Sequence, residues 1–133
     1  MPSAFNAHNT NPSSQYPQAW ERAGNVKLLV LDVDGVLTNG QVFIGADGKE
    51  SLKAFDIQDG LGIKLLEQCG IPTAIITGRN SKMVLARCEE LGIKHVHMGV
   101  ENKAIALDEV LKTLGLSSKD CAVMGDDWPD LAM

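Results

Sequence analysis

The stretch LLVLDVDGVLTNG, residues 28–40, is an apolar run that ends in two aspartates one residue apart, Asp32 and Asp34. Residues 26–31 are rich in β-prone apolar side chains, which predicts a strand covered on both faces, as in a parallel sheet. Two carboxylates about 4 Å apart repel each other by roughly 4 kcal/mol at an effective dielectric constant of about 20. A divalent cation removes that cost, so the pair predicts a cation site at the end of this strand.

Length and composition restrict the class of protein. The 133 residues favour one domain, which we expect over residues 25–133, after a flexible leader, residues 1–24, with a short helix near residues 19–23. The net charge of −5 argues against a nucleic-acid partner, and no apolar run approaches the roughly 20 residues of a membrane span. The leader lacks the basic start and apolar core of a signal peptide, and the three cysteines form no C-x-x-C pair. We therefore expect a cytoplasmic protein with reduced thiols and no membrane partner.

The rest of the chain alternates β-prone and helical stretches. Two β-prone pieces flank the turn signal Ala46-Asp47-Gly48 and predict a hairpin over about residues 41–55. Further core strands are predicted at residues 72–76, 93–98 and 121–125. Four helices are predicted. They begin at Asp59-Gly60, after a cap at Asn80 or Ser81, at Asn102 and near Trp128. The first three end at Gly70, Gly92 and Leu114. This alternation predicts an α/β fold, a doubly wound parallel sheet with a β-hairpin flap after the first strand and no cap domain.

Chemically active side chains follow the predicted strands, at the sheet edge where α/β proteins bind ligands. Asp32, Asp34 and Asp126 offer oxygen ligands to a hard cation, and Mg²⁺ is the cation that favours a few carboxylates with phosphate oxygens. Thr77 offers a hydroxyl beside the backbone N–H groups of a helix start, and Lys103 offers a positive charge. Together these groups suit recognition of a phosphoryl group and neutralisation of its transfer.

Four segments of the sequence resemble, in order, the motifs of the haloacid dehalogenase superfamily: DVDGVLT (residues 32–38), IITGR (residues 75–79), Lys103 and GDDWPD (residues 125–130). The resemblance covers residues 28–133 and implies a Rossmann-like core with Mg²⁺ held by Asp32, Asp34 and Asp126, helped by a backbone carbonyl near Val33. It also implies that Asp32 is the nucleophile, that Asp34 is the acid and base, and that Thr77 and Lys103 hold the phosphate. The roles of Asp127 and Asp130 stay open.

Within that superfamily, the short hairpin and the segments FDIQDGLGIKLL, ITGRNSKMVLARCEELGI and NKAIAL are similar to the capless 3-deoxy-D-manno-octulosonate 8-phosphate phosphatases. This closer resemblance implies a role in lipopolysaccharide precursor biosynthesis, a sugar-acid phosphate as substrate, and a homotetramer whose neighbouring subunits help shape each site. Arg79 and Arg87 are eight residues apart, which would let them share a helix face. Lys64 stands where many relatives have arginine and lacks the bidentate fork. The implied substrate contacts are Asp34, Asp56, Ile57, Gln58, Asp59, Gly60, Lys64, Arg79, Arg87 and Lys103.

Alternative interpretations were weighed against this one. A calcium loop would need a third oxygen ligand and a glycine where Val36 and Leu37 stand, which excludes it. A nine-carbon, sialic-type sugar acid 9-phosphate fits the same chemistry, and a phosphoacceptor signalling module fits less well because GDD follows Lys103. His95 and His97 alternate along a strand and are expected to be structural. Members of the family normally extend several tens of residues further, so we expect a C-terminal part to be missing, and the 133-residue chain alone to be poorly stable and weakly active or an inactive fragment.

Overall fold

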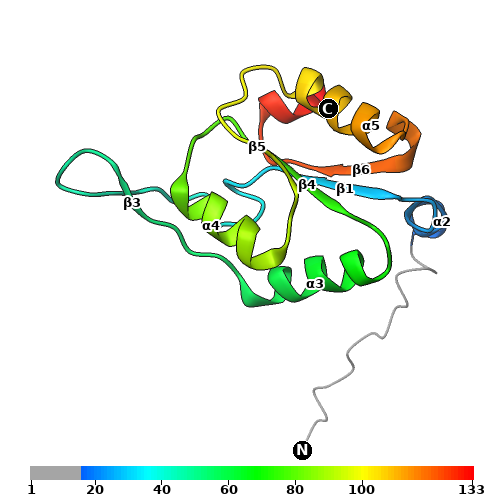
Figure 1. The fold of residues 1–133 in the computed structure, drawn as a ribbon, viewed down its shortest axis with the longest axis horizontal. Helices are drawn as coiled ribbons and strands as arrows, with labels where there is room; N and C mark the ends of the chain where they lie inside the picture. The colour runs from blue at the N-terminus through cyan, green and yellow to red at the C-terminus, as the bar shows by residue number, and fades with distance from the viewer. Residues whose placement is uncertain (1–15) are drawn as a thin grey trace, which may run out of the picture.

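The computed structural model describes residues 16–133, and its centre is a four-stranded parallel sheet (Figure 1). The strands are β1 (Leu28–Leu31), β4 (Thr73–Ile76), β5 (His95–His97) and β6 (Cys121–Met124), arranged in the order β5-β4-β1-β6. Helix α3 (Ile57–Gln68) connects β1 to β4, α4 (Lys82–Leu91) connects β4 to β5, and α5 (Lys103–Leu114) leads back across the sheet toward β6. The predicted doubly wound α/β fold is therefore confirmed.

Two hydrophobic clusters cover the two faces of the sheet, as the alternation of side chains along β1 and β4 requires. On one face Val30 and Ile76 pack against α5. On the other face Leu31 and Ile75 pack against α3 and α4, and Figure 1 shows these two helices on the side of the sheet opposite to α5. The chain direction across the sheet reverses between β1 and β6, so the carboxyl ends of these two strands flank the switch point where such folds bind ligands.

Local capping signals set the helix boundaries. Ser81 caps α4, Asn102 caps α5, and Gly92 ends α4 with a left-handed backbone, as predicted. The start of α3 was predicted two residues too late. Its first residue is Ile57, because the Asp56 side chain accepts a hydrogen bond of 2.7 Å from the backbone N–H of Gln58.

The predicted hairpin is present but pairs over a short length. Its strands β2 (Phe43–Ile44) and β3 (Glu50–Leu52) are antiparallel, with an irregular register. Figure 1 shows the hairpin reaching away from the body of the molecule, and the side chains of Phe43, Ile44 and Leu52 are exposed. The chain returns to the body at Lys53, whose side chain is buried.

The predicted short helix of the leader is α2 (Pro17–Ala23), while residues 1–15 of that leader lie outside the described residues. Two short 3₁₀ turns, η1 (Ser118–Asp120) and η2 (Trp128–Ala132), flank β6. Over residues 16–133, no helix has the length and apolar character needed to cross a membrane.

The strand predicted at residues 121–125 is present as β6, but its side chains are not buried as those of a core strand are. In the described part of the chain, β6 lies at the edge of the sheet with a partner on one side only, and the side chain of Met124 is 55% exposed. An apolar groove of about 460 Å³ lies beside it, between the sheet and α3. Leu61 and Leu65 of α3 and Ile105 of α5 are also exposed.

This packing predicts different costs for two isoleucine truncations. Ile75→Ala removes a fully buried side chain between the sheet and α4 and is expected to lower the free energy of unfolding by about 2–5 kcal/mol. Ile105→Ala removes a side chain that is 58% exposed and should change it by no more than about 0.5 kcal/mol. Urea unfolding of both variants measures the difference, and equal losses would contradict the assigned core.

Candidate active site

The site lies at the carboxyl edge of the sheet, where the turns after three strands meet the start of α5. Asp32 directly follows β1, Thr77 directly follows β4, and Asp126 lies two residues beyond β6. The backbone N–H of Asp32 donates to the carbonyl of Met124 at 3.0 Å, which joins the ends of β1 and β6. Lys103 is the first residue of α5. The sheet therefore brings Asp32, Asp126 and Lys103 together, and Thr77 lies at the end of the strand next to β1.

Three carboxylates form a cluster that can hold a cation. Asp32, Asp126 and Asp130 each offer an oxygen, and these oxygens all lie within 4.8 Å of one another. Gly35, with φ of +83°, passes so close that a Cβ there would lie 1.8 Å from Asp126 Oδ2, so the loop leaves room for this carboxylate only because residue 35 has no side chain. An all-oxygen donor set of this kind fits Mg²⁺.

Lys103 neutralises part of this cluster. Its Nζ lies 3.0 Å from Asp32 Oδ1 and 2.5 Å from Asp130 Oδ1, and its side chain is only 5% exposed. Burial alone would lower the pKa of Lys103, but the hydrogen bonds to Asp130 and Asp32 outweigh it, and the pKa lies above its usual value. The ammonium therefore stays charged and faces the carboxylates.

Asp130, whose role the sequence left open, organises the loop after β6. Its Oδ2 accepts hydrogen bonds from the backbone N–H groups of Asp126 at 3.0 Å and Asp127 at 3.2 Å. Burial would raise the pKa of Asp130, but the hydrogen bonds, above all that of Lys103, lower it below the usual value of 3.8. The three-residue spacing of Asp127 and Asp130, that of a capping box, was the available signal for this role.

The Asp34 carboxylate points to a different set of partners. It forms an ion pair with Lys53 through Oδ1, and its Oδ2 lies 3.8 Å from Nε of Arg79. The cluster of Asp32, Asp126 and Asp130 does not include the Asp34 side chain, and a role of Asp34 in binding the cation stays a prediction. Lys53, which sequence reasoning missed, comes from the end of the hairpin 19 residues away, and no local pattern links it to Asp34.

Thr77 is buried at the end of β4. Its backbone N–H donates to the carbonyl of His97, and its carbonyl accepts from Val100, so both neighbouring turns hold it in place. Its hydroxyl accepts a long hydrogen bond of 3.5 Å from the backbone N–H of Arg79. His97 itself lies 3.9 Å from Glu109 and belongs to no metal-binding group of the described residues.

Arg87 holds the loop before α3 against α4. Its guanidinium donates to Glu90 at 2.8 Å and to the carbonyl of Asp56 at 3.1 Å, and it lies 5.8 Å from the ring centre of Phe55. Gly60 packs so closely that a Cβ would lie 2.4 Å from Arg87 Nη2. Within this chain, Arg87 therefore fixes the position of the loop before α3, and Gly60 leaves the space that the guanidinium occupies.

The remaining predicted substrate contacts lie on the surface around this loop. Arg79 precedes α4 rather than lying on it, so the prediction that Arg79 and Arg87 share a helix face was wrong. The Arg79 side chain is 48% exposed beside Asp34. The other exposed members of the predicted set are on or next to the first two turns of α3: Asp56, Ile57, Gln58, Asp59 and Lys64.

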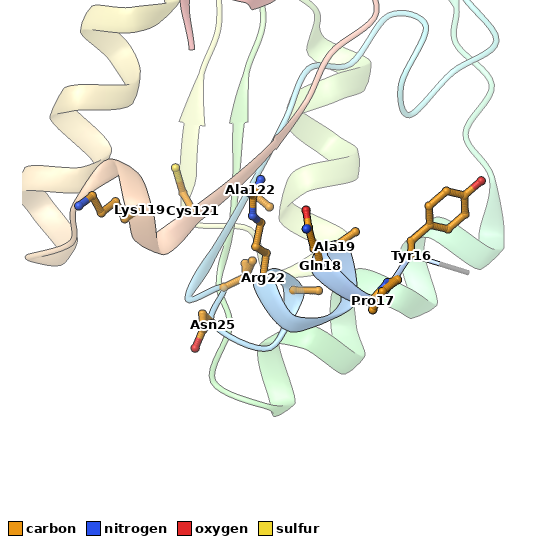
Figure 2. Close-up of a pocket in the computed structure, with 11 residues that line it drawn as sticks. Tyr16, Pro17, Gln18, Ala19, Arg22, Asn25, Lys119, Cys121 and Ala122 are labelled. Carbon is orange, nitrogen blue, oxygen red and sulfur yellow. The ribbon is translucent and has the colours of Figure 1, made fainter. Parts of the chain in front are cut away.

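Two hollows in the surface differ in their distance from the carboxylate cluster: one borders it and the other lies at the opposite ends of the strands. A hollow of about 550 Å³ borders the site and is lined in part by Asp126 and Asp130. A wider one, of about 900 Å³, lies under α2 at the amino ends of the strands, where Figure 2 shows Arg22, Lys119 and Cys121 around it. The wider hollow lies away from the carboxyl edge, and none of the buried charged residues lines it.

The ion pairs of Asp130 predict a pH dependence of stability. Because the pKa of Asp130 is lower in the folded state, its contribution is present above the usual value of 3.8 and is lost as the pH falls through the folded value. Asp130→Asn should lower the free energy of unfolding at pH 7 and reduce how much of it is lost as the pH falls below the usual value of 3.8. Denaturant unfolding of the wild type and of Asp130→Asn at several pH values, in the presence of a chelator, measures how the free energy of unfolding depends on pH. The same pH dependence in both proteins would contradict the lowered pKa of Asp130.

The sequence of the chain is similar to those of known phosphatases. The chain is 45% identical over 116 residues to the 3-deoxy-D-manno-octulosonate 8-phosphate phosphatase KdsC of Salmonella typhimurium, which covers 85% of this chain and 61% of that protein. Over 111 residues it is 46% identical to KdsC of Escherichia coli strain K12, covering 81% of this chain and 58% of that protein. The chain thus spans about three fifths of the length of these curated relatives. No family model matches it.

Solved structures are similar as well. The phosphatase of Moraxella catarrhalis, in complex with magnesium ion, phosphate ion and a KDO molecule, gives a TM-score of 0.80 at 48% identity, covering 84% of this chain and 64% of that one. A putative haloacid dehalogenase (HAD) superfamily hydrolase of subfamily III A from Legionella pneumophila gives 0.85 at 44% identity, covering 91% and 66%. The ordered motifs and the fold of the present chain, together with these similarities, show that the chain belongs to the haloacid dehalogenase superfamily.

Proposed function

We propose that the protein is a Mg²⁺-dependent phosphomonoesterase that hydrolyses 3-deoxy-D-manno-octulosonate 8-phosphate to the free sugar acid and phosphate. The observation that carries the proposal is the buried Lys103 between Asp32 and Asp130, with Asp126 beside them, at the switch point of the sheet. The similarity to phosphatases of this substrate, at 45 to 48% identity, supports the substrate class.

Asp32, Asp126 and Asp130 are the residues that would hold Mg²⁺. Their oxygens lie close enough to share one cation, and Gly35 keeps the space beside Asp126 free of a side chain. When bound, the ion would offset the negative charge of these carboxylates and of the substrate phosphoryl group. The magnesium and phosphate ions in the similar Moraxella catarrhalis structure support this choice of metal.

The residues of the chain divide the reaction between them. A carboxylate oxygen of Asp32 attacks phosphorus, the bond from phosphorus to the sugar oxygen breaks, and Asp34 gives its proton to that oxygen. Asp34 then takes a proton from water, whose oxygen attacks the phosphoaspartate and releases phosphate and free Asp32. Lys103 and Thr77 bind the phosphoryl oxygens and stabilise the charge that develops on them.

The two aspartates have surroundings that fit these different tasks. Asp32 is buried beside Lys103 and the other two carboxylates, as a nucleophile held next to a cation should be. Asp34 lies outside that cluster and reaches solvent beside Arg79, where a proton can be exchanged with the leaving group and with water. Carboxylates in unlike environments commonly divide the roles of nucleophile and acid in this way.

Recognition of the sugar acid is assigned to exposed groups around the site. Arg79, beside Asp34, and Lys64, on the second turn of α3, offer positive charge to the substrate carboxylate. Arg87 and Gly60 would act by holding the loop of residues 55–60 in position.

Assembly and cellular context complete the proposal. The exposed Phe43, Ile44 and Leu52 of the hairpin support a homotetramer in which neighbouring subunits border each site. The substrate would place the protein in lipopolysaccharide precursor biosynthesis, and the three free cysteines fit a cytoplasmic location.

The test is phosphate release from 3-deoxy-D-manno-octulosonate 8-phosphate with and without Mg²⁺. Turnover should require the metal, and Asp32→Asn should lower kcat at least about 10³-fold because the nucleophile is lost. Asp47→Asn, at an exposed turn of the hairpin, is the matched control and should keep full activity. Absence of Mg²⁺-dependent turnover in the full-length protein would refute the proposal, and a higher kcat/KM for a nine-carbon sugar acid 9-phosphate would reassign the substrate.

A further inference from the structure

We propose that Lys53 is a positioning residue for the reaction: it holds the carboxylate of Asp34 in the orientation from which Asp34 transfers protons. This inference rests on the proposed phosphatase function and adds a residue of the hairpin to the machinery of the site. Lys53 belongs to none of the four motifs of the sequence and is not among the residues that bind metal or phosphate in the proposed mechanism.

The first observation is the burial of the Lys53 ammonium. Its side chain is 1% exposed, and its Nζ forms ion pairs with Asp34 and with Glu50, the latter at 2.8 Å. A lysine is almost never buried unless its charge is paired. Burial alone would lower the pKa of Lys53, but the hydrogen bonds to the two carboxylates raise it above its usual value, so the group is a permanent cation.

The second observation is how the other partners of Asp34 are placed. Arg79 approaches the second oxygen of Asp34 only to 3.8 Å, and its side chain is half exposed to solvent. An exposed pair of this kind contributes little to holding a side chain in place. Lys53 is therefore the buried anchor of Asp34, while the side that faces Arg79 stays open to substrate and water.

The third observation is that each of the two neighbouring aspartates has its own lysine. Lys103 contacts Asp32 from the start of α5, and Lys53 contacts Asp34 from the end of the hairpin. The two cations draw the carboxylates in different directions and keep Asp34 out of the cluster of Asp32, Asp126 and Asp130. Glu50, on β3, in turn holds Lys53.

The consequence for the reaction concerns proton transfer alone. In the first step the phosphorus–oxygen bond to the sugar breaks as Asp32 bonds to phosphorus, and the proton of Asp34 moves to the sugar oxygen. In the second step a water proton moves to Asp34 while the water oxygen bonds to phosphorus and Asp32 is released. Without Lys53, Asp34 would turn away, and both proton transfers would slow while attack by Asp32 would remain.

Two substrates separate this role from a general loosening of the site. The sugar phosphate has an alkoxide leaving group that needs the proton of Asp34, whereas 4-nitrophenyl phosphate has a leaving group that departs without one. Lys53→Met, close to lysine in length but uncharged, is compared with Lys53→Arg, which keeps the charge. Lys49→Met is the matched control, because it makes the same change at an exposed lysine of the same hairpin.

In the full-length protein with Mg²⁺, Lys53→Met should lower kcat for the sugar phosphate about 10- to 100-fold and change KM less than about threefold. This loss is part of the roughly 10²- to 10⁴-fold rate enhancement that acid–base catalysis contributes. With 4-nitrophenyl phosphate, rapid quench should show a burst of nitrophenol at the wild-type rate, followed by slow turnover as the phosphoaspartate waits for water. Lys53→Arg should recover most of the activity, and Lys49→Met should resemble the wild type. In a crystal structure of Lys53→Met, the Asp34 carboxylate should leave its present position.

The outcomes are distinct. A nitrophenol burst that slows as much as sugar-phosphate turnover would show a merely structural role and overturn the inference, as would unchanged kinetics of Lys53→Met. If Lys53→Met does not fold, Lys53→Gln, which also removes the charge, takes its place: a slowed burst overturns the inference, and a normal burst with slowed turnover supports it. A wild-type protein without turnover of either substrate would overturn the proposed function, whereas an active wild type with unaffected variants would overturn only the role of Lys53.

Discussion

The buried ion pairs of Lys103 are the interaction on which the site depends. Asp32, Asp126 and Asp130 converge at one edge of the sheet, and Lys103 reaches two of them from the first residue of α5. At separations of about 4 Å, each carboxylate pair would repel by roughly 4 kcal/mol at an effective dielectric constant of about 20. A buried cation is therefore needed beside the carboxylates. Lys103 supplies it from the first turn of α5, which restricts the movement of its side chain.

The topology of the sheet explains why these groups meet. The order β5-β4-β1-β6 places Asp32, after β1, next to the loop that follows β6, and the direction of winding reverses between these two strands. Right-handed crossovers put α3 and α4 on one face and α5 on the other, so α5 starts beside the same switch point. Residues 32, 103 and 126, which are far apart in the sequence, thus become neighbours.

The residues whose place in the fold could be predicted are those next to a strand end or a helix start. Asp32 and Thr77 directly follow their strands, Lys103 lies at a helix start, and Ser81 caps its helix. Lys53 could not be found in this way, since it reaches Asp34 through the return of an exposed hairpin. An apolar stretch also does not distinguish a central strand from an edge strand, which is why β6 was placed in the core.

Arg87 and Asp130 show a second limit of sequence reasoning, because both depend on tertiary contacts. The resemblance implies that Arg87 contacts the substrate, which stays a prediction. Within this chain its guanidinium contacts Asp56, Glu90 and the ring of Phe55. The sequence left the role of Asp130 open, and its place beside Lys103, Asp32 and Asp126 follows from tertiary contacts alone.

The most direct measurement of the central claim is the identity of the residue that carries the phosphoryl group. The full-length protein is mixed with substrate and Mg²⁺, quenched during turnover, reduced with borohydride and digested for mass spectrometry. Reduction of an acyl phosphate converts the aspartate to homoserine, and we predict this conversion at residue 32 and at no other acidic residue. Conversion at another residue, or turnover without any conversion at Asp32, would contradict the account.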